Sequence, residues 1–188
     1  MFNILQNSIL VDRKFLWPML RKIECLSNFI YFTFSQMRLY ECPFTNDELI
    51  SDAYPHKLRE DIGCLEFESR MIDKLADEDD PNSKYQVVDI VENFDLQPYE
   101  MKKAAFMGWV KSFMPKRKAQ LEQNSPEKVA DFMKEAKAFA SYIASNFAKI
   151  TVYMGKSGDP DGMLLFSEER DGKEYFLLLE KGADNFKC

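Results

Sequence analysis

The clearest hydrophobic pattern lies at the end of the chain, from Ile150 to Cys188. Three apolar segments of strand length are separated by turn residues, of which Asp171-Gly172 is the plainest pair. The segments are 150–154, 163–166 and 175–179. Apolar runs between Asp-Gly turns are typical of consecutive antiparallel strands, so we predict an antiparallel meander that closes the chain.

Two amphipathic helices are predicted before this meander, over 99–123 and 126–147, because apolar residues recur there in steps of three and four. Asn124-Ser125-Pro126 separates them, since serine caps a helix and proline suits its first position. The short connection makes the segment 99–147 an antiparallel helical hairpin. Pro115 lies inside the first helix, where a proline removes a hydrogen bond, so we expect a kink or a break.

Shorter strands are predicted at 38–42, 63–67 and 86–91, where apolar and β-branched residues alternate with polar ones. Thr45 or Asn46 is placed to cap a helical turn after the first of these strands. Strands on both sides of a helical hairpin indicate an α+β fold with mostly antiparallel sheets and with the hairpin packed on or beside one of them.

An acidic loop is predicted from Met71 to Tyr85. Its centre carries a run of carboxylates followed by a proline, and such a run does not bury apolar area. The carboxylates are Asp77, Glu78, Asp79 and Asp80. Carboxylate oxygens are hard ligands suited to calcium, so these four residues are weak calcium candidates. The group Asp47, Glu48 and Asp52 is the alternative, and spacing favours neither group.

The first 36 residues differ from the rest of the chain. They contain the aromatic and β-branched run Phe29–Phe34, within an uncharged stretch that is too short to span a bilayer. No small-residue cleavage site precedes Met37. Two interpretations stay open: a targeting or anchoring segment, and an extension outside the functional domain, with Met37 as the working start.

Composition narrows the class of protein. The chain has 188 residues, 46% of them hydrophobic, and a net charge of −6. These values fit one folded domain, predicted over 37–188, and disfavour nucleic-acid binding, which needs a cationic surface. The four cysteines form no Cys-x-x-Cys pair, which argues against a disulfide framework or a zinc ribbon and suits the cytoplasm. We expect no membrane partner.

The candidate motifs for phosphate binding, calcium binding and catalysis are incomplete in this sequence. Gly155-Lys156-Ser157 lacks the first glycine of a phosphate-binding loop and is followed by a turn and a strand. Asp159 to Gly162 has its glycine too early for a calcium-binding loop. His56 is the single histidine, and no nucleophile elbow accompanies it. The sequence therefore predicts a binding protein that is not an enzyme and requires no cofactor.

Basic residues gather on the first predicted helix, in an otherwise acidic chain. Such a group is suited to docking an acidic partner, such as a tubulin tail, through salt-sensitive contacts, and an ordinary solvated helix face is the alternative that stays open. The candidates are Lys111, Lys116, Arg117 and Lys118. The terminal Cys188 is expected to be exposed, and two interpretations stay open: an intermolecular disulfide that gives a homodimer, and an inert free thiol.

Several of these segments together resemble the translationally controlled tumour protein family, over residues 37–188. The C-terminal block is the specific part, and the helices alone are generic. The matching residues are Phe44 to Leu49, Ser51-Asp52, Val88 to Val91, Pro126 to Val129, Asn146-Phe147, Tyr153 to Gly155, Asp159 to Met163 and Lys187-Cys188.

The resemblance implies a tent-like β-sheet domain with a projecting helical hairpin. It also implies a cytoplasmic, growth-related protein that binds calcium and associates with microtubules. Two alternatives follow from the same resemblance: regulation of a Ras-like small GTPase, and binding of anti-apoptotic Bcl-family proteins. Glu48, with its neighbour Asp47, falls where the family has a glutamate proposed to contact the GTPase.

The chain departs from the family pattern at several positions. Lys156 stands where a glutamate normally follows the glycine, and the loop of 71–85 is short. Pro115 interrupts the first helix, and the tail from Ala183 to Phe186 lacks the usual glutamates. The resemblance is therefore to a divergent member, and it weakens the expectation of calcium binding.

Overall fold

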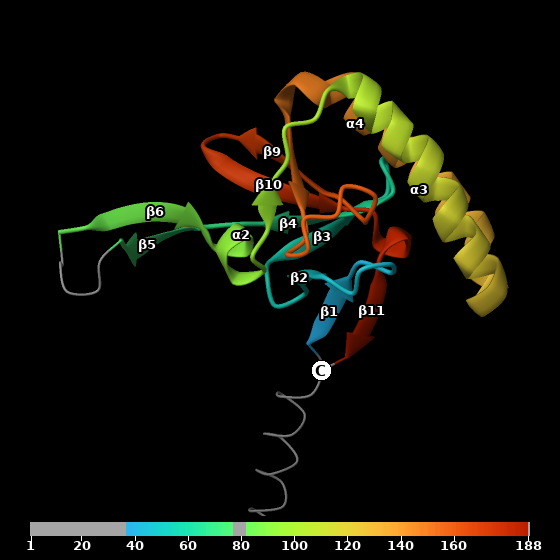
Figure 1. The fold of residues 1–188 in the computed structure, drawn as a ribbon, viewed down its shortest axis with the longest axis horizontal. Helices are drawn as coiled ribbons and strands as arrows, with labels where there is room; N and C mark the ends of the chain where they lie inside the picture. Colours follow the sequence, from blue (N-terminus) through green and yellow to red (C-terminus); the bar gives the residue numbers. More distant parts are fainter. Residues whose placement is uncertain (1–36, 77–81, 188) are drawn as a thin grey trace, which may run out of the picture. The chain divides into compact units, whose positions relative to one another are not determined.

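A computed structural model describes residues 37–76 and 82–187 of the chain. All of them belong to a single compact unit. Three antiparallel sheets and a helical hairpin make up this unit, so the predicted α+β class is confirmed (Figure 1).

The largest sheet has six strands in the order β3-β4-β10-β9-β8-β7. The bounds are β3 His56–Arg59, β4 Cys64–Glu68, β7 Gln97–Pro98, β8 Ile150–Met154, β9 Leu165–Arg170 and β10 Lys173–Leu178. Strands β8, β9 and β10 are direct neighbours, which confirms the predicted meander. Asp171 and Gly172 join β9 to β10 and both have positive φ, at 54° and 74°, as a two-residue type I′ hairpin turn requires.

A second sheet of three strands has the order β11-β1-β2. It joins β1 (Arg38–Glu41) and β2 (Glu48–Ser51) to β11 (Asp184–Lys187), so the two ends of the described unit are paired antiparallel. The helical turn predicted after β1 is wrong. Asn46 adopts a positive φ of 58° in a tight turn, and the chain continues as β2 because its apolar residues are buried against β1.

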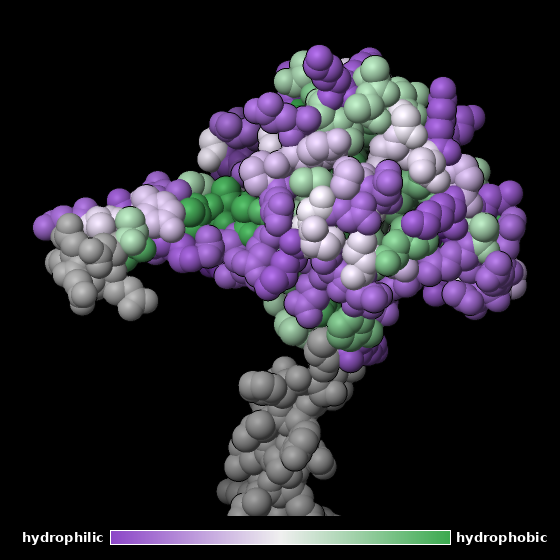
Figure 2. All heavy atoms as spheres, viewed as in Figure 1, coloured by the Kyte–Doolittle hydropathy of each residue, from purple (hydrophilic) through white to green (hydrophobic). Residues whose placement is uncertain are grey.

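The predicted loop of 71–85 is also wrong at both of its ends. Strand β5 (Met71–Leu75) pairs with β6 (Lys84–Val88) in a two-stranded ribbon that stands away from the sheets (Figure 1). The acidic run explains only the connection between these strands, and Asp77 to Asp80 lie outside the described residues. Figure 2 shows a mostly hydrophilic face, with apolar side chains gathered at the base of this ribbon.

The strand predicted over 86–91 ends early, at Val88, and a short helix α2 (Asp89–Asn93) follows. Asp89 causes the change of direction. Its buried carboxylate accepts hydrogen bonds from the backbone amides of Arg70, at 2.9 Å, and Ile90, at 2.8 Å. The backbone amide of Asp89 donates to the carbonyl of Arg70, so the ribbon is closed at its base.

The helical hairpin consists of α3 (Lys103–Asn124) and α4 (Val129–Asn146), joined through the short 3₁₀ helix η1 (Pro126–Lys128). Its first helix begins four residues later than predicted, because Tyr99 still hydrogen-bonds to Val152 of β8. The predicted break at Pro115 is absent. Helix α3 continues through this exposed proline, since buried apolar residues before and after it hold the helix against the core.

The hydrophobic core joins the hairpin to the six-stranded sheet. Phe166 of β9 makes edge-to-face contacts with Phe106 and Trp109 of α3 and with Phe139 of α4, at centroid distances of 5.5–5.7 Å. The indole nitrogen of Trp109 donates a 2.9 Å hydrogen bond to the carbonyl of Gly162. Aromatic pairs of this kind fix relative orientation as well as burying area, so α3 has a defined position on the sheet.

Candidate functional site

The basic residues of α3 divide into two kinds. Lys111 and Lys116 are exposed, and Lys118 is partly exposed beside Glu122, with 3.3 Å between its ammonium nitrogen and the carboxylate. The ammonium group of Lys116 lies 3.9 Å from the centre of the Phe44 ring, a cation–π contact that orients it. These three lysines place their ammonium groups at the surface of one helix.

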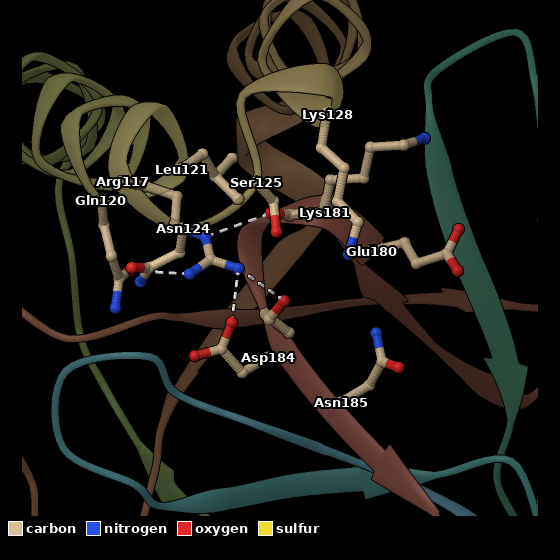
Figure 3. A pocket seen from close by; sticks show the side chains of 11 residues that line it. Arg117, Gln120, Leu121, Asn124, Ser125, Lys128, Glu180, Lys181, Asp184 and Asn185 are labelled. Carbon is tan, nitrogen blue, oxygen red and sulfur yellow. Dashed lines mark hydrogen bonds and ion pairs between the residues drawn. The ribbon is translucent and has the colours of Figure 1, made fainter.

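Arg117 is different, because it is buried and only 3% of its surface is exposed. Its guanidinium donates to four oxygens (Figure 3). The acceptors are the carbonyls of Lys181 (3.2 Å) and Ala183 (2.9 Å), the amide oxygen of Gln120 (2.7 Å) and the carboxylate of Asp184 (2.7 Å). The prediction that Arg117 contacts a partner is therefore contradicted by its burial and by the use of four of its five N–H donors inside the protein.

In the turn between β1 and β2, the side chain of Glu48 is exposed to solvent and the side chain of Asp47 is hydrogen-bonded within the protein. The carboxylate of Asp47 accepts hydrogen bonds from the hydroxyls of Thr45, at 2.8 Å, and Ser157, at 2.5 Å, and from the backbone amide of Ser157. Glu48, the first residue of β2, is exposed. Of the two predicted GTPase contacts, Asp47 therefore fixes the turn and Glu48 has a carboxylate at the surface.

A cavity of about 340 Å³ opens beside this turn. Its lining residues come from three parts of the chain: Asn46, Asp47, Glu48, Asn93, Phe94, Asp95 and Lys156. The ammonium of Lys156 pairs with the carboxylate of Asp95 at 2.8 Å, and this hydrogen bond raises the pKa of Lys156 and lowers the pKa of Asp95. Sequence reasoning missed Asn93 to Asp95, because nothing in their local pattern relates them to a turn almost fifty positions earlier.

Metal-binding geometry is absent from the described residues, since no three His, Cys, Asp or Glu side chains there are grouped to hold an ion. The calcium candidates Asp77, Glu78, Asp79 and Asp80, and the disulfide candidate Cys188, lie outside those residues and stay predictions. Cys42 and Cys64 are free and buried.

No helix within the described ranges is long and apolar enough to cross a membrane. His56 is exposed, and its Nδ1 lies 2.9 Å from the backbone carbonyl oxygen of Tyr54, two residues earlier.

The family model for translationally controlled tumour protein matches residues 37–183. The chain belongs to this family. Among curated members, the protein of Oryctolagus cuniculus is 32% identical over 174 residues, which cover 81% of this chain and 100% of the relative. The homologue of Mycosarcoma maydis is 31% identical over 159 residues, which cover 77% of this chain and 95% of the relative.

Solved structures of the family agree with this fold. The tumour-associated protein p23fyp of Schizosaccharomyces pombe superposes with a TM-score of 0.69 at 29% identity, covering 80% of this chain and 99% of that one. The family member of Caenorhabditis elegans gives a TM-score of 0.59 at 24% identity and supports the fold alone. The family resemblance drawn from the sequence is thereby confirmed, and residues 1–36 lie outside the family match.

Proposed function

We propose that this family member is a non-enzymatic, growth-related binding protein that docks on acidic protein surfaces, with the tails of tubulin as the expected partner. The observation that carries the proposal is the arrangement of Lys111, Lys116 and Lys118 on α3. Their ammonium groups lie at the surface of a helix that the buried Arg117 anchors. The names of the related proteins describe no catalytic activity, which supports a binding role.

Electrostatics favours such a partner over a nucleic acid. The chain as a whole carries a net charge of −6, so the exposed lysines of α3 are a local feature of an acidic protein. A flexible acidic protein tail can reach these lysines without bringing a long anionic surface against the rest of the domain. Contacts between exposed charges are screened by salt, so the interaction is expected to weaken as ionic strength rises.

Binding to polymerised tubulin tests the proposal. The wild-type chain is compared in co-sedimentation with a variant in which Lys111, Lys116 and Lys118 are all replaced by Gln. A matched control replaces Lys134, Lys137 and Lys149, which are exposed on and after α4. We expect the first variant to lose most of its binding at low salt and the control to keep it, whereas equal loss in both would reject a specific role for α3.

A second candidate function is regulation of a small GTPase through Glu48. The support is that Glu48 is exposed on a turn held firmly by Asp47, beside a polar cavity. Glu48 lies at the start of a strand, so its charge does not serve to stabilise the start of a helix. Nucleotide release from a Ras-like GTPase is compared for wild type, Glu48→Ala and the exposed control Glu60→Ala; equal rates in all three would remove this function.

A further inference from the structure

A second cavity, of about 290 Å³, lies between the junction of the helical hairpin and the C-terminal segment (Figure 3). One wall comes from the end of α3 and from η1. The opposite wall comes from the 3₁₀ helix η3 (Glu180–Gly182) and the start of β11. The lining residues are Arg117, Gln120, Leu121, Asn124, Ser125, Lys128, Glu180, Lys181, Ala183, Asp184 and Asn185. A cavity of this size suits one side chain or a small polar group.

Most charges in this lining are already paired. Arg117 contacts Asp184, and Lys181 pairs with Glu135 of α4. Glu180 lies 3.9 Å from the guanidinium of Arg38. Lys128 is the one lining charge that has no ion pair among residues 37–76 and 82–187, and Figure 3 shows its side chain extending into the cavity. The unpaired charge in the cavity is therefore positive.

Neutral donors flank this lysine. Asn124 and Ser125 lie at the hairpin junction, and Asn185 lies on β11 across the cavity. The side chains of these three residues make no hydrogen bond to another described residue. An ammonium group with side-chain amides and a hydroxyl around it matches the oxygens of a carboxylate, which accepts several hydrogen bonds at once.

We propose that this cavity binds one acidic side chain of a partner peptide, with Lys128 as the charged contact and Asn124 and Asn185 as donors. The inference rests on the proposed docking of acidic partners and names a specific anchor for it. The exposed lysines of α3 attract an acidic segment, and the cavity fixes one of its carboxylates.

Helical geometry sets the spacing in such a peptide. Lys116, Gln120 and Asn124 follow one another at intervals of four residues and so lie along one face of α3. At a rise of about 1.5 Å per residue, Lys116 lies about 12 Å along the axis from Asn124. An extended peptide covers that length in about four residues, so acidic residues about four positions apart would reach both Lys116 and the cavity.

Fluorescence anisotropy of the full chain with a labelled peptide of alternating Glu and Gly residues tests the site, with a Gln-for-Glu peptide as the uncharged comparison. Lys128→Gln is set against Lys134→Gln, which removes the same charge from an exposed position of α4 outside the cavity. We expect Lys128→Gln to weaken binding about tenfold, as for loss of one charge-assisted contact. Lys134→Gln should change binding less than twofold, and Asn185→Ala should have an intermediate effect.

The outcomes separate the two proposals. If the Glu peptide binds wild type but Lys128→Gln and Lys134→Gln weaken it equally, the cavity is not the anchor, although docking on α3 stands. If the Glu peptide binds no better than the Gln peptide, both proposals fall. A far-ultraviolet spectrum and an unfolding curve that match wild type confirm that Lys128→Gln is folded.

Discussion

Arg117, in the middle of α3, donates a 2.7 Å hydrogen bond to Asp184, the first residue of β11. The same guanidinium holds the carbonyls of Lys181 and Ala183 just before that strand. Because β11 pairs with β1, this single side chain connects the helical hairpin to the three-stranded sheet. Of the three consecutive basic residues of α3, Arg117 is therefore buried and holds the fold together, whereas Lys116 and Lys118 lie at the surface.

Replacing Arg117 by Gln should destabilise the fold. The change removes a buried cation and leaves two backbone carbonyls, the amide oxygen of Gln120 and the carboxylate of Asp184 without their donor, which costs about 3 kcal/mol. The adjacent exposed change Lys116→Gln should cost less than about 0.5 kcal/mol. Urea unfolding of both variants and wild type measures the difference, and a stable Arg117→Gln variant would mean that the anchor is dispensable.

Two glycines give a second, paired prediction. A Cβ added at Gly155 would lie 2.6 Å from the Cβ and the Oδ2 of Asp47, whereas one added at Gly108 meets nothing within 4 Å. Gly155→Ala should therefore displace the Asp47 turn and cost about 1–3 kcal/mol, as for other overpacked sites.

Gly108→Ala is the control for that change. It adds a methyl group to an open position within α3 and should stabilise the protein by about 0.5–1 kcal/mol. Thermal unfolding compares the two. A similar stability for both variants would show that Gly155 tolerates a side chain and that the turn adapts to it.

The sequence predicted those elements whose signals are local. The turn Asp171-Gly172 predicted the hairpin of β9 and β10, although the predicted middle segment, 163–166, covers only the first two residues of β9. The apolar spacing predicted both helices. Strand β5 and its pairing with β6 were missed, and only the end of β6 was predicted, because these strands carry charges on exposed faces and are held by pairing with each other and not by burial. Local patterns do not reveal such long-range pairing.

The candidate site was predicted in part for the same reason. A run of basic residues on a helix marks a charged face, but it does not say which member turns inward. Arg117 was grouped with Lys116 and Lys118 because its acceptors lie more than sixty positions later in the chain. Only the packing of the C-terminal segment against α3 distinguishes this residue from its neighbours.

The environment of the Glu66 carboxyl leads to a prediction of how the free energy of unfolding changes at acid pH. This residue is 2% exposed on β4. Burial acts to raise the pKa of its carboxyl, but a hydrogen bond from Arg59 and ion pairs with Lys57 and Arg170 outweigh burial and hold the pKa below the ordinary value of 4.5. A lowered pKa in the folded state adds stability above pH 4.5, and that stability is lost as pH falls through the folded pKa.

Glu66→Gln should therefore cost about 2 kcal/mol at neutral pH, as for the loss of charge-assisted hydrogen bonds. Below pH 4.5 the gap to wild type should narrow, because the wild-type carboxyl becomes neutral as well. Urea unfolding across the acid range measures both curves, with the exposed Glu60→Gln as control. Parallel curves for wild type and Glu66→Gln would contradict the lowered pKa.

The central claim is that α3 docks on an acidic partner tail, and the tail itself provides the most direct measurement. Wild-type chain is co-sedimented at low salt with intact microtubules and with microtubules from which protease has removed the acidic tails. The account predicts that the wild-type chain binds strongly to intact microtubules. Its binding to the tailless microtubules should be no greater than that of the variant in which Lys111, Lys116 and Lys118 are replaced by Gln. Equal binding of the wild-type chain to both kinds of microtubule would contradict it.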